Sequence, residues 1–231
     1  MTTTIDSPIA NHRQAGVLLH ITSLPGTGHK GNLGQEARNF LNFMRDSGLS
    51  VWQILPLGPT HLDGSPYQCL STHAGNPELI DLQWLLQRGW IQHPLPAHID
   101  ASTHHDLLIE AADFFLREAD RAWQSHYQQF LHDNDYWLAD YALYMALKEA
   151  HNHSDWRNWP KPLCLRQPDA IQAAHEQYSD RVEQLKVIQF VFFTQWAELR
   201  RDANAMGIRL FGDMPIYVSM DSADVWSARE N

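Results

Sequence analysis

Two apolar runs separated by an amphipathic segment limit the folds open to this chain. Residues 15–21 (AGVLLHI) and 51–57 (VWQILPL) are almost continuously apolar, which is typical of strands buried in a parallel sheet. Between these runs, apolar side chains recur with the spacing of a helix, and Gly48 follows as a helix stop; these side chains are Ala37, Phe40, Leu41 and Met44. A strand, a helix and a second strand in this order predict a parallel sheet covered on both faces.

The middle of the chain has a different pattern, in which helical spacing prevails. We expect helices near 106–116, 135–150 and 171–206, interrupted by the proline-containing stretches QHPLPAHID and NWPKPL. An apolar, β-branched run then predicts a third strand over 208–218. The sequence therefore predicts an α/β fold with a large helical insertion after strand two, divided into residues 1–68, 69–207 and 208–231.

Asp213 is a carboxylate inside the third apolar run, after Gly212 and two residues before Pro215. In parallel α/β folds, ligands lie beyond the carboxyl ends of the strands. We expect Asp213 to be half-buried at such an end, with Gly212 permitting a close backbone approach, so its carboxylate must accept hydrogen bonds. Two interpretations stay open: a ligand hydroxyl donates to Asp213, or Asp213 fastens the end of the strand through the protein's own groups.

The stretch after strand two gathers polar side chains among glycines and prolines. Ser65, Tyr67 and Gln68 offer hydroxyl and amide groups beside an aromatic ring, which suits a polyol such as a sugar. For Asn76 and Asp81, the capping of a structured loop is the preferred interpretation.

Composition excludes several other classes of function. A formal net charge of −10 over 231 residues argues against a nucleic-acid partner, which requires a basic face. No apolar run approaches the roughly 18 residues of a membrane span, and the first residues do not have the pattern of a signal peptide. Cys69 and Cys164 lie far apart and match no metal spacing, and the 14 histidines are interpreted as surface residues. We therefore expect a cytoplasmic protein with no metal site.

Five motifs follow one another along the chain: SLPG, WQILPLGPT, GSPYQ, AGNPELIDL and GDMPIYVSMDSADVW. Together they resemble the amylomaltases, or 4-alpha-glucanotransferases (disproportionating enzymes), from about Gln14 to the end of the chain. The resemblance implies a (β/α)8 barrel of the α-amylase superfamily with helical insertions, of which this chain holds about three of eight strands. It also implies an enzyme that moves α-1,4-glucan segments between maltooligosaccharides by a retaining mechanism, without a metal or organic cofactor.

The resemblance also implies roles for three residues. Asp213 matches the family's first conserved aspartate, at the end of barrel strand three in the sugar-binding floor. Ser65 and Tyr67 match the loop that lines the donor side of the cleft. We therefore expect Ser65, Tyr67 and Asp213 to bind substrate. The chain departs from the family pattern at Cys69, where a serine is common, and at Glu78, where an aromatic residue is common, and these departures concern fine contacts.

The family's catalytic carboxylates are expected elsewhere. A retaining enzyme needs a nucleophilic carboxylate and a carboxylic acid about 5–5.5 Å apart. By resemblance, these groups and a stabilising aspartate come from barrel strands four, five and seven, so we expect no catalytic residue in this chain. Asp221 and Asp224 are interpreted as helix-start residues. The isolated chain is then expected to be inactive.

Two alternatives stay open beside a partial 4-alpha-glucanotransferase. One is a non-catalytic glucan-binding or assembly module that works with a separately encoded carboxy-terminal half. The other is a sequencing or gene-model truncation of a longer protein, with no independent function. The expected ligands are α-1,4-glucans and maltooligosaccharides.

Overall fold

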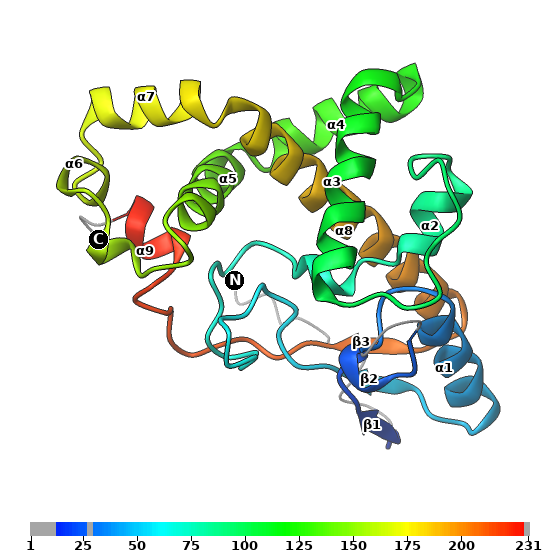
Figure 1. The fold of residues 1–231 in the computed structure, drawn as a ribbon. Coiled ribbons are helices and arrows are strands. Elements are labelled where there is room, and N and C mark those ends of the chain that lie inside the picture. The colour runs from blue at the N-terminus through cyan, green and yellow to red at the C-terminus, as the bar shows by residue number, and fades with distance from the viewer. Residues whose placement is uncertain (1–12, 27–29, 229–231) are drawn as a thin grey trace, which may run out of the picture.

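The sheet of the molecule has three parallel strands. The computed structural model describes residues 13–26 and 30–228 (Figure 1). Strands β1 (Gly16–Leu18), β2 (Val51–Gln53) and β3 (Arg209–Phe211) lie in this order, with β2 in the middle. The expected parallel sheet is confirmed, although β2 and β3 are joined by the whole helical middle of the chain.

Helices make up most of the rest and lie above and beside the strands in Figure 1. The α-helices are α1 (Gln35–Asp46), α2 (Leu82–Gln87), α3 (Ala101–Glu118), α4 (Arg121–Asp133), α5 (Asp135–Ala150), α6 (Lys161–Cys164), α7 (Pro168–Gln177), α8 (Ser179–Ala205) and α9 (Ala223–Ser227). Three short 3-10 helices are η1 (Ile21–Ser23), η2 (Pro77–Leu79) and η3 (Trp156–Asn158).

The expected helices are present with adjusted bounds. Helix α5 begins and ends where the spacing predicted, α3 extends the stretch 106–116 at both ends, and the stretch 171–206 is divided between α7 and α8 at Tyr178. Gly48 follows α1 with a φ of +70°, a left-handed conformation that glycine adopts without strain.

The strands are shorter than the apolar runs predicted. The runs 15–21, 51–57 and 208–218 each contribute only three residues to the sheet. Proline has no N–H group for a ladder, so Pro56 and Pro215 turn the later parts of two runs into loop.

The expectation that both faces of the sheet are covered is wrong for the described residues. Val17, Trp52 and Leu210 are paired across the strands, so their side chains share one face, and this face packs on the core. On the other face Leu18 and Phe211 are 55% and 52% exposed.

Two clusters of buried side chains stabilise the fold. The larger cluster joins Trp52 and Ile208 of the sheet region to Phe115 of α3 and Phe192 of α8, so strands and helices share one core. The second cluster is centred on α5 and includes Trp226 of α9. No helix in the described part of the chain combines the length and the apolar character that crossing a membrane requires.

Two glutamines of α8 bind the backbone of the chain after β2. Gln189 accepts a hydrogen bond from Gly75 N at 2.8 Å and donates to Gly75 O at 2.9 Å. Gln195 makes the same pair of bonds with Asp81, at 2.8 and 3.1 Å. Both glutamines are 1% exposed, so these bonds satisfy side-chain amides that are almost out of contact with water.

Candidate functional site

The three parallel strands deliver the chain segments that follow them to one edge of the sheet. β1 is followed by His20, and β2 by residues 54–76, the strand-two loop. β3 is followed by residues 212–222, the strand-three segment. Tyr67 lies in the strand-two loop and Asp213 in the strand-three segment.

The structure brings Tyr67 and Asp213 together. The phenol of Tyr67 donates a hydrogen bond to Oδ2 of Asp213 at 2.8 Å, and we call these two side chains the phenol–carboxylate pair. The bond raises the pKa of Tyr67 above its ordinary value, because the protonated phenol is the donor. Tyr67 remains 46% exposed, so its ring can still contact a ligand.

Asp213 is exposed, so the expectation of a half-buried carboxylate is wrong. β3 ends at Phe211, and the chain has left the sheet before it reaches Asp213. A Cβ at Gly212 would meet no described atom within 4 Å, so the close backbone approach expected there is wrong too. A carboxylate with one phenol donor keeps acceptor capacity for further hydroxyl groups.

Ser65 lies in a turn of the same loop as Tyr67. Gly64, with a φ of +71°, forms the turn, and the N–H of Ser65 donates to Oδ1 of Asp63 at 3.2 Å. The N–H of Gln68 donates to Ser65 O, also at 3.2 Å. Within residues 13–26 and 30–228, no hydrogen bond joins Ser65 to the phenol–carboxylate pair.

The capping interpretation of Asn76 and Asp81 is confirmed. Oδ1 of Asn76 accepts from Glu78 N at 3.0 Å at the start of η2. Oδ1 of Asp81 accepts from Gln83 N at 3.1 Å at the start of α2. Both side chains therefore stabilise the loop's exit.

Pockets surround this edge of the sheet. One of about 420 Å³ has Tyr67 in its wall, one of about 220 Å³ has Asp213, and one of about 350 Å³ has His20. Burial lowers the pKa of His20, so its imidazole is neutral at neutral pH and can both donate and accept hydrogen bonds. Such polar groups around small concavities suit a ligand rich in hydroxyls.

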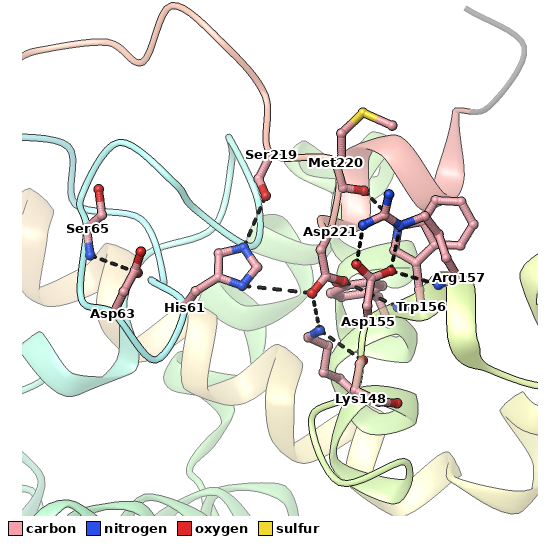
Figure 2. A network of polar contacts seen from close by, with 12 residues as sticks. His61, Asp63, Ser65, Lys148, Asp155, Trp156, Arg157, Ser219, Met220 and Asp221 are labelled. Carbon is pink, nitrogen blue, oxygen red and sulfur yellow. Dashed lines mark hydrogen bonds and ion pairs between the residues drawn. The ribbon is translucent and has the colours of Figure 1, made fainter.

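A buried network holds the far end of the strand-three segment, as Figure 2 shows. The carboxylate of Asp221 accepts from Nζ of Lys148 at 2.5 Å and from the hydroxyl of Tyr144 at 2.7 Å. The side chain of Lys148 is 4% exposed and that of Asp221 is 17% exposed. Beside them, Nε1 of Trp156 donates to Met220 O at 2.8 Å.

The helix-start interpretation holds for Asp224 and is wrong for Asp221. Asp224 lies in the first turn of α9 and also accepts from N and Oγ1 of Thr72, each at 2.9 Å. Ser222 is the N-cap residue, so Asp221 precedes the helix and its carboxylate binds the network. One signal was present in the sequence: Lys148 continues the buried face of Tyr144 on α5, where a charge requires a partner.

His61 connects the two loops at this network (Figure 2). Its Nε2 lies 3.1 Å from Oγ of Ser219, and its Nδ1 lies 3.9 Å from Oδ2 of Asp221. His61 belongs to the strand-two loop, so the loop that carries Tyr67 reaches the same network as the segment that carries Asp213. Among the described residues no cluster of three or more histidine, cysteine or acidic side chains could hold a metal ion.

Comparisons with known proteins indicate the family of the chain. A family model described as 4-alpha-glucanotransferase matches residues 19–231. The chain is 42% identical to the 4-alpha-glucanotransferase of Thermus thermophilus, over 94% of this chain and 45% of that protein. It is 40% identical to the Synechocystis sp. 4-alpha-glucanotransferase, over 95% of this chain and 46% of that protein.

A solved structure also resembles this chain in its fold. The amylomaltase from Streptococcus agalactiae in complex with acarbose superposes with a TM-score of 0.87 at 35% identity, over 95% of this chain and 46% of that one. The chain spans about half the length of the curated relatives it matches. Because the family model covers nearly all of its residues, the chain belongs to the 4-alpha-glucanotransferase family.

Proposed function

We propose that this chain is part of a 4-alpha-glucanotransferase that transfers α-1,4-glucan segments between maltooligosaccharides with retention of configuration. One observation carries the proposal: the phenol–carboxylate pair joins two loops at the edge of the sheet where parallel α/β folds bind their ligands. The family match and the relative solved with acarbose support a glucan as the ligand.

Three side chains are proposed to contact the glucan. The exposed ring of Tyr67 offers an apolar face on which a sugar ring can stack, and its hydroxyl orients the carboxylate. Asp213 accepts hydrogen bonds from sugar hydroxyls, and a charged acceptor makes the stronger class of hydrogen bond. Ser65 contributes a hydroxyl from the turn before Tyr67.

The finer architecture is part of the same proposal. The three strands are proposed to be the first three of a (β/α)8 barrel, with residues 69–207 as a mainly helical insertion between residues 1–68 and 208–231. The parallel pairing of β2 with β3, across that long stretch of helices, supports this division. We also propose a cytoplasmic location, because the 231 residues contain only two cysteines, Cys69 and Cys164, which lie far apart in the sequence, and low cysteine usage is typical of a reducing compartment.

The transfer reaction is proposed to need groups beyond those described here. Retention requires a nucleophilic carboxylate and an acid on either side of the scissile bond. The family resemblance assigns these groups to barrel strands four, five and seven. The carboxy-terminal part of the barrel, whether continuous with these residues or separately encoded, is therefore the proposed partner. Residues 1–231 alone are expected to leave maltotriose unchanged, and the release of glucose with longer products would overturn this part.

Binding of the glucan is tested by titration calorimetry with acarbose and maltoheptaose. Tyr67→Ala and Asp213→Ala should each weaken binding about tenfold, equivalent to about 1.4 kcal/mol, since each removes a direct ligand contact. Phe43→Ala and Asp46→Ala are the matched controls, because these exposed side chains lie at the end of α1 that leads into β2, away from the proposed site.

The control variants should bind as the unmodified chain does. Equal affinity in Tyr67→Ala, Asp213→Ala and both controls, with all four proteins folded, would remove these residues from the site. An absence of binding by the unmodified chain at millimolar ligand would overturn the proposal that Ser65, Tyr67 and Asp213 contact a glucan.

A further inference from the structure

We propose that Lys148 and His61 are positioning residues for the phenol–carboxylate pair. By holding Asp221 and Ser219 at the end of the strand-three segment, these two side chains fix the path of that segment and the place of Asp213 beside Tyr67. The inference rests on the proposed function in one respect: it takes the pair to be the part of the chain that contacts glucan.

The middle of the strand-three segment has little support of its own. Met214, Ile216 and Tyr217 are each more than four-fifths exposed. No backbone–backbone hydrogen bond of residues 212–220 is present in the described structure. The path of this stretch is therefore set by what holds its two ends.

One end is β3, and the other is the network around Asp221. There the carboxylate is bound by a lysine from α5, by Tyr144 from the same helix and, at 3.4 Å, by Trp156 N. Nζ of Lys148 also donates to Ser154 O at 3.0 Å, and this second bond holds the ammonium group in place beside Asp221. Removal of the ammonium would leave a mostly buried carboxylate without its counter-charge, and the segment's end would then be released towards water.

His61 connects the strand-two loop to the same network around Asp221. Its ring lies between Ser219 and Asp221, as Figure 2 shows, at 3.1 and 3.9 Å. Four residues later the same loop carries Ser65, and then Tyr67. Both members of the phenol–carboxylate pair are thus located relative to one network, on loops that are otherwise separate in sequence.

The hydroxyl of Tyr67 reports directly on this positioning, without any ligand. Its pKa is raised above 10.0, and the largest cause is the hydrogen bond to Asp213. When Asp213 moves away, the pKa of Tyr67 must fall towards 10.0. A change that only lowers the stability of the fold leaves this pKa where it is in the molecules that remain folded.

The experiment is an NMR titration of the whole chain with ring-labelled tyrosine, in which Tyr67→Phe identifies the resonance of Tyr67. In Lys148→Met and in His61→Ala, the midpoint for Tyr67 should shift down towards 10.0. Lys148→Arg keeps the charge, so its midpoint for Tyr67 should lie between that of Lys148→Met and that of the unmodified chain. Lys186→Met is the matched control, since it removes a lysine paired with Glu183 on α8, and it should leave the midpoint unchanged.

An unchanged Tyr67 midpoint in folded Lys148→Met overturns the role of Lys148. If Lys148→Met does not fold, His61→Ala decides, and an unchanged midpoint there overturns the inference. Calorimetry with maltoheptaose on the same variants should show weaker binding wherever the midpoint has shifted. Because the titration contains no glucan, a failure of glucan binding and a failure of positioning give separate results.

Discussion

The two loops that bring Tyr67 and Asp213 together are stabilised in different ways. The second half of the strand-two loop is part of the folded core: Leu70, Ala74 and Asn76 are buried. The N–H groups of Leu70 and Asn76 also donate to backbone carbonyls at 2.8 Å. The strand-three segment is mostly exposed and is held at its ends. One wall of the proposed site therefore depends on close packing, and the other depends on a few polar contacts some distance from Asp213.

The largest expected effect is a difference in stability between alanine variants of two glycines, Gly75 in the strand-two loop and Gly212 in the strand-three segment. A Cβ at Gly75 would lie 1.9 Å from the ring of Phe192, a core side chain that is 2% exposed, whereas Gly212 has open space around it. Gly75→Ala should lower the free energy of unfolding by about 3 kcal/mol, and Gly212→Ala should change it by less than about 0.5 kcal/mol. Urea unfolding measures both. Similar costs for the two variants would contradict the difference between the walls.

Hydrogen exchange tests the same difference without a mutation. The N–H groups of Leu70 and Asn76, two buried residues, are hydrogen-bonded to backbone carbonyls, and those of Ile216 and Tyr217 are not bonded to described backbone. Exchange at the second pair should be faster by about a hundredfold or more, since it requires no unfolding of the core. Mass spectrometry of peptic peptides resolves the two stretches, and comparable protection in both would mean that the strand-three segment is packed after all.

A smaller effect is expected from the cap at the exit of the strand-two loop. Asn76→Ala removes the acceptor for Glu78 N at a buried position and should cost about 1–2 kcal/mol of unfolding free energy. Asp63→Ala removes the acceptor for Ser65 N at the exposed end of the same loop and should cost less than about 0.5 kcal/mol. Equal costs, measured by urea unfolding, would show that the whole loop is packed uniformly.

The smallest effect concerns pH. Because the pKa of Tyr67 is raised in the folded state, the phenol–carboxylate bond stabilises the protein at pH values below 10.0. This contribution is lost as the pH rises through the raised pKa. Unfolding of Tyr67→Phe and the unmodified chain should differ at pH 8 and converge above pH 10.0. A difference that persists at the alkaline end would show that the hydroxyl acts through something other than its proton.

The sequence predicted the bounds of helices better than the lengths of strands. Helix spacing and its stops depend on near neighbours, so the bounds of α5 and the stop at Gly48 were predicted correctly. The length of a strand depends on its partner, so the β-branched residues after Pro215 predict strand where the structure has an exposed loop. The same error placed Asp213 on a half-buried strand end.

The candidate site shows the same limit. Side-chain chemistry at strand ends was enough to select Tyr67 and Asp213, and the structure joins them. The network of Lys148 and Asp221 was missed because its members are 73 positions apart, and nothing local indicates which carboxylate a buried lysine will bind. Ser65 was selected by the same chemistry, and the substrate-binding role of all three residues stays a prediction.

The hydrogen bonds of Gln189 and Gln195 on α8 also fix the number of residues between Gly75 and Asp81. Gln195 follows Gln189 by six positions, and Asp81 follows Gly75 by six, so the two bonded sites advance together along the helix by about 9 Å. An insertion or deletion between Gly75 and Asp81 would leave one buried side-chain amide unbonded, together with the backbone N–H and C=O groups of one residue. Loop exchange between relatives should therefore fail between Gly75 and Asp81 unless the residue number is kept.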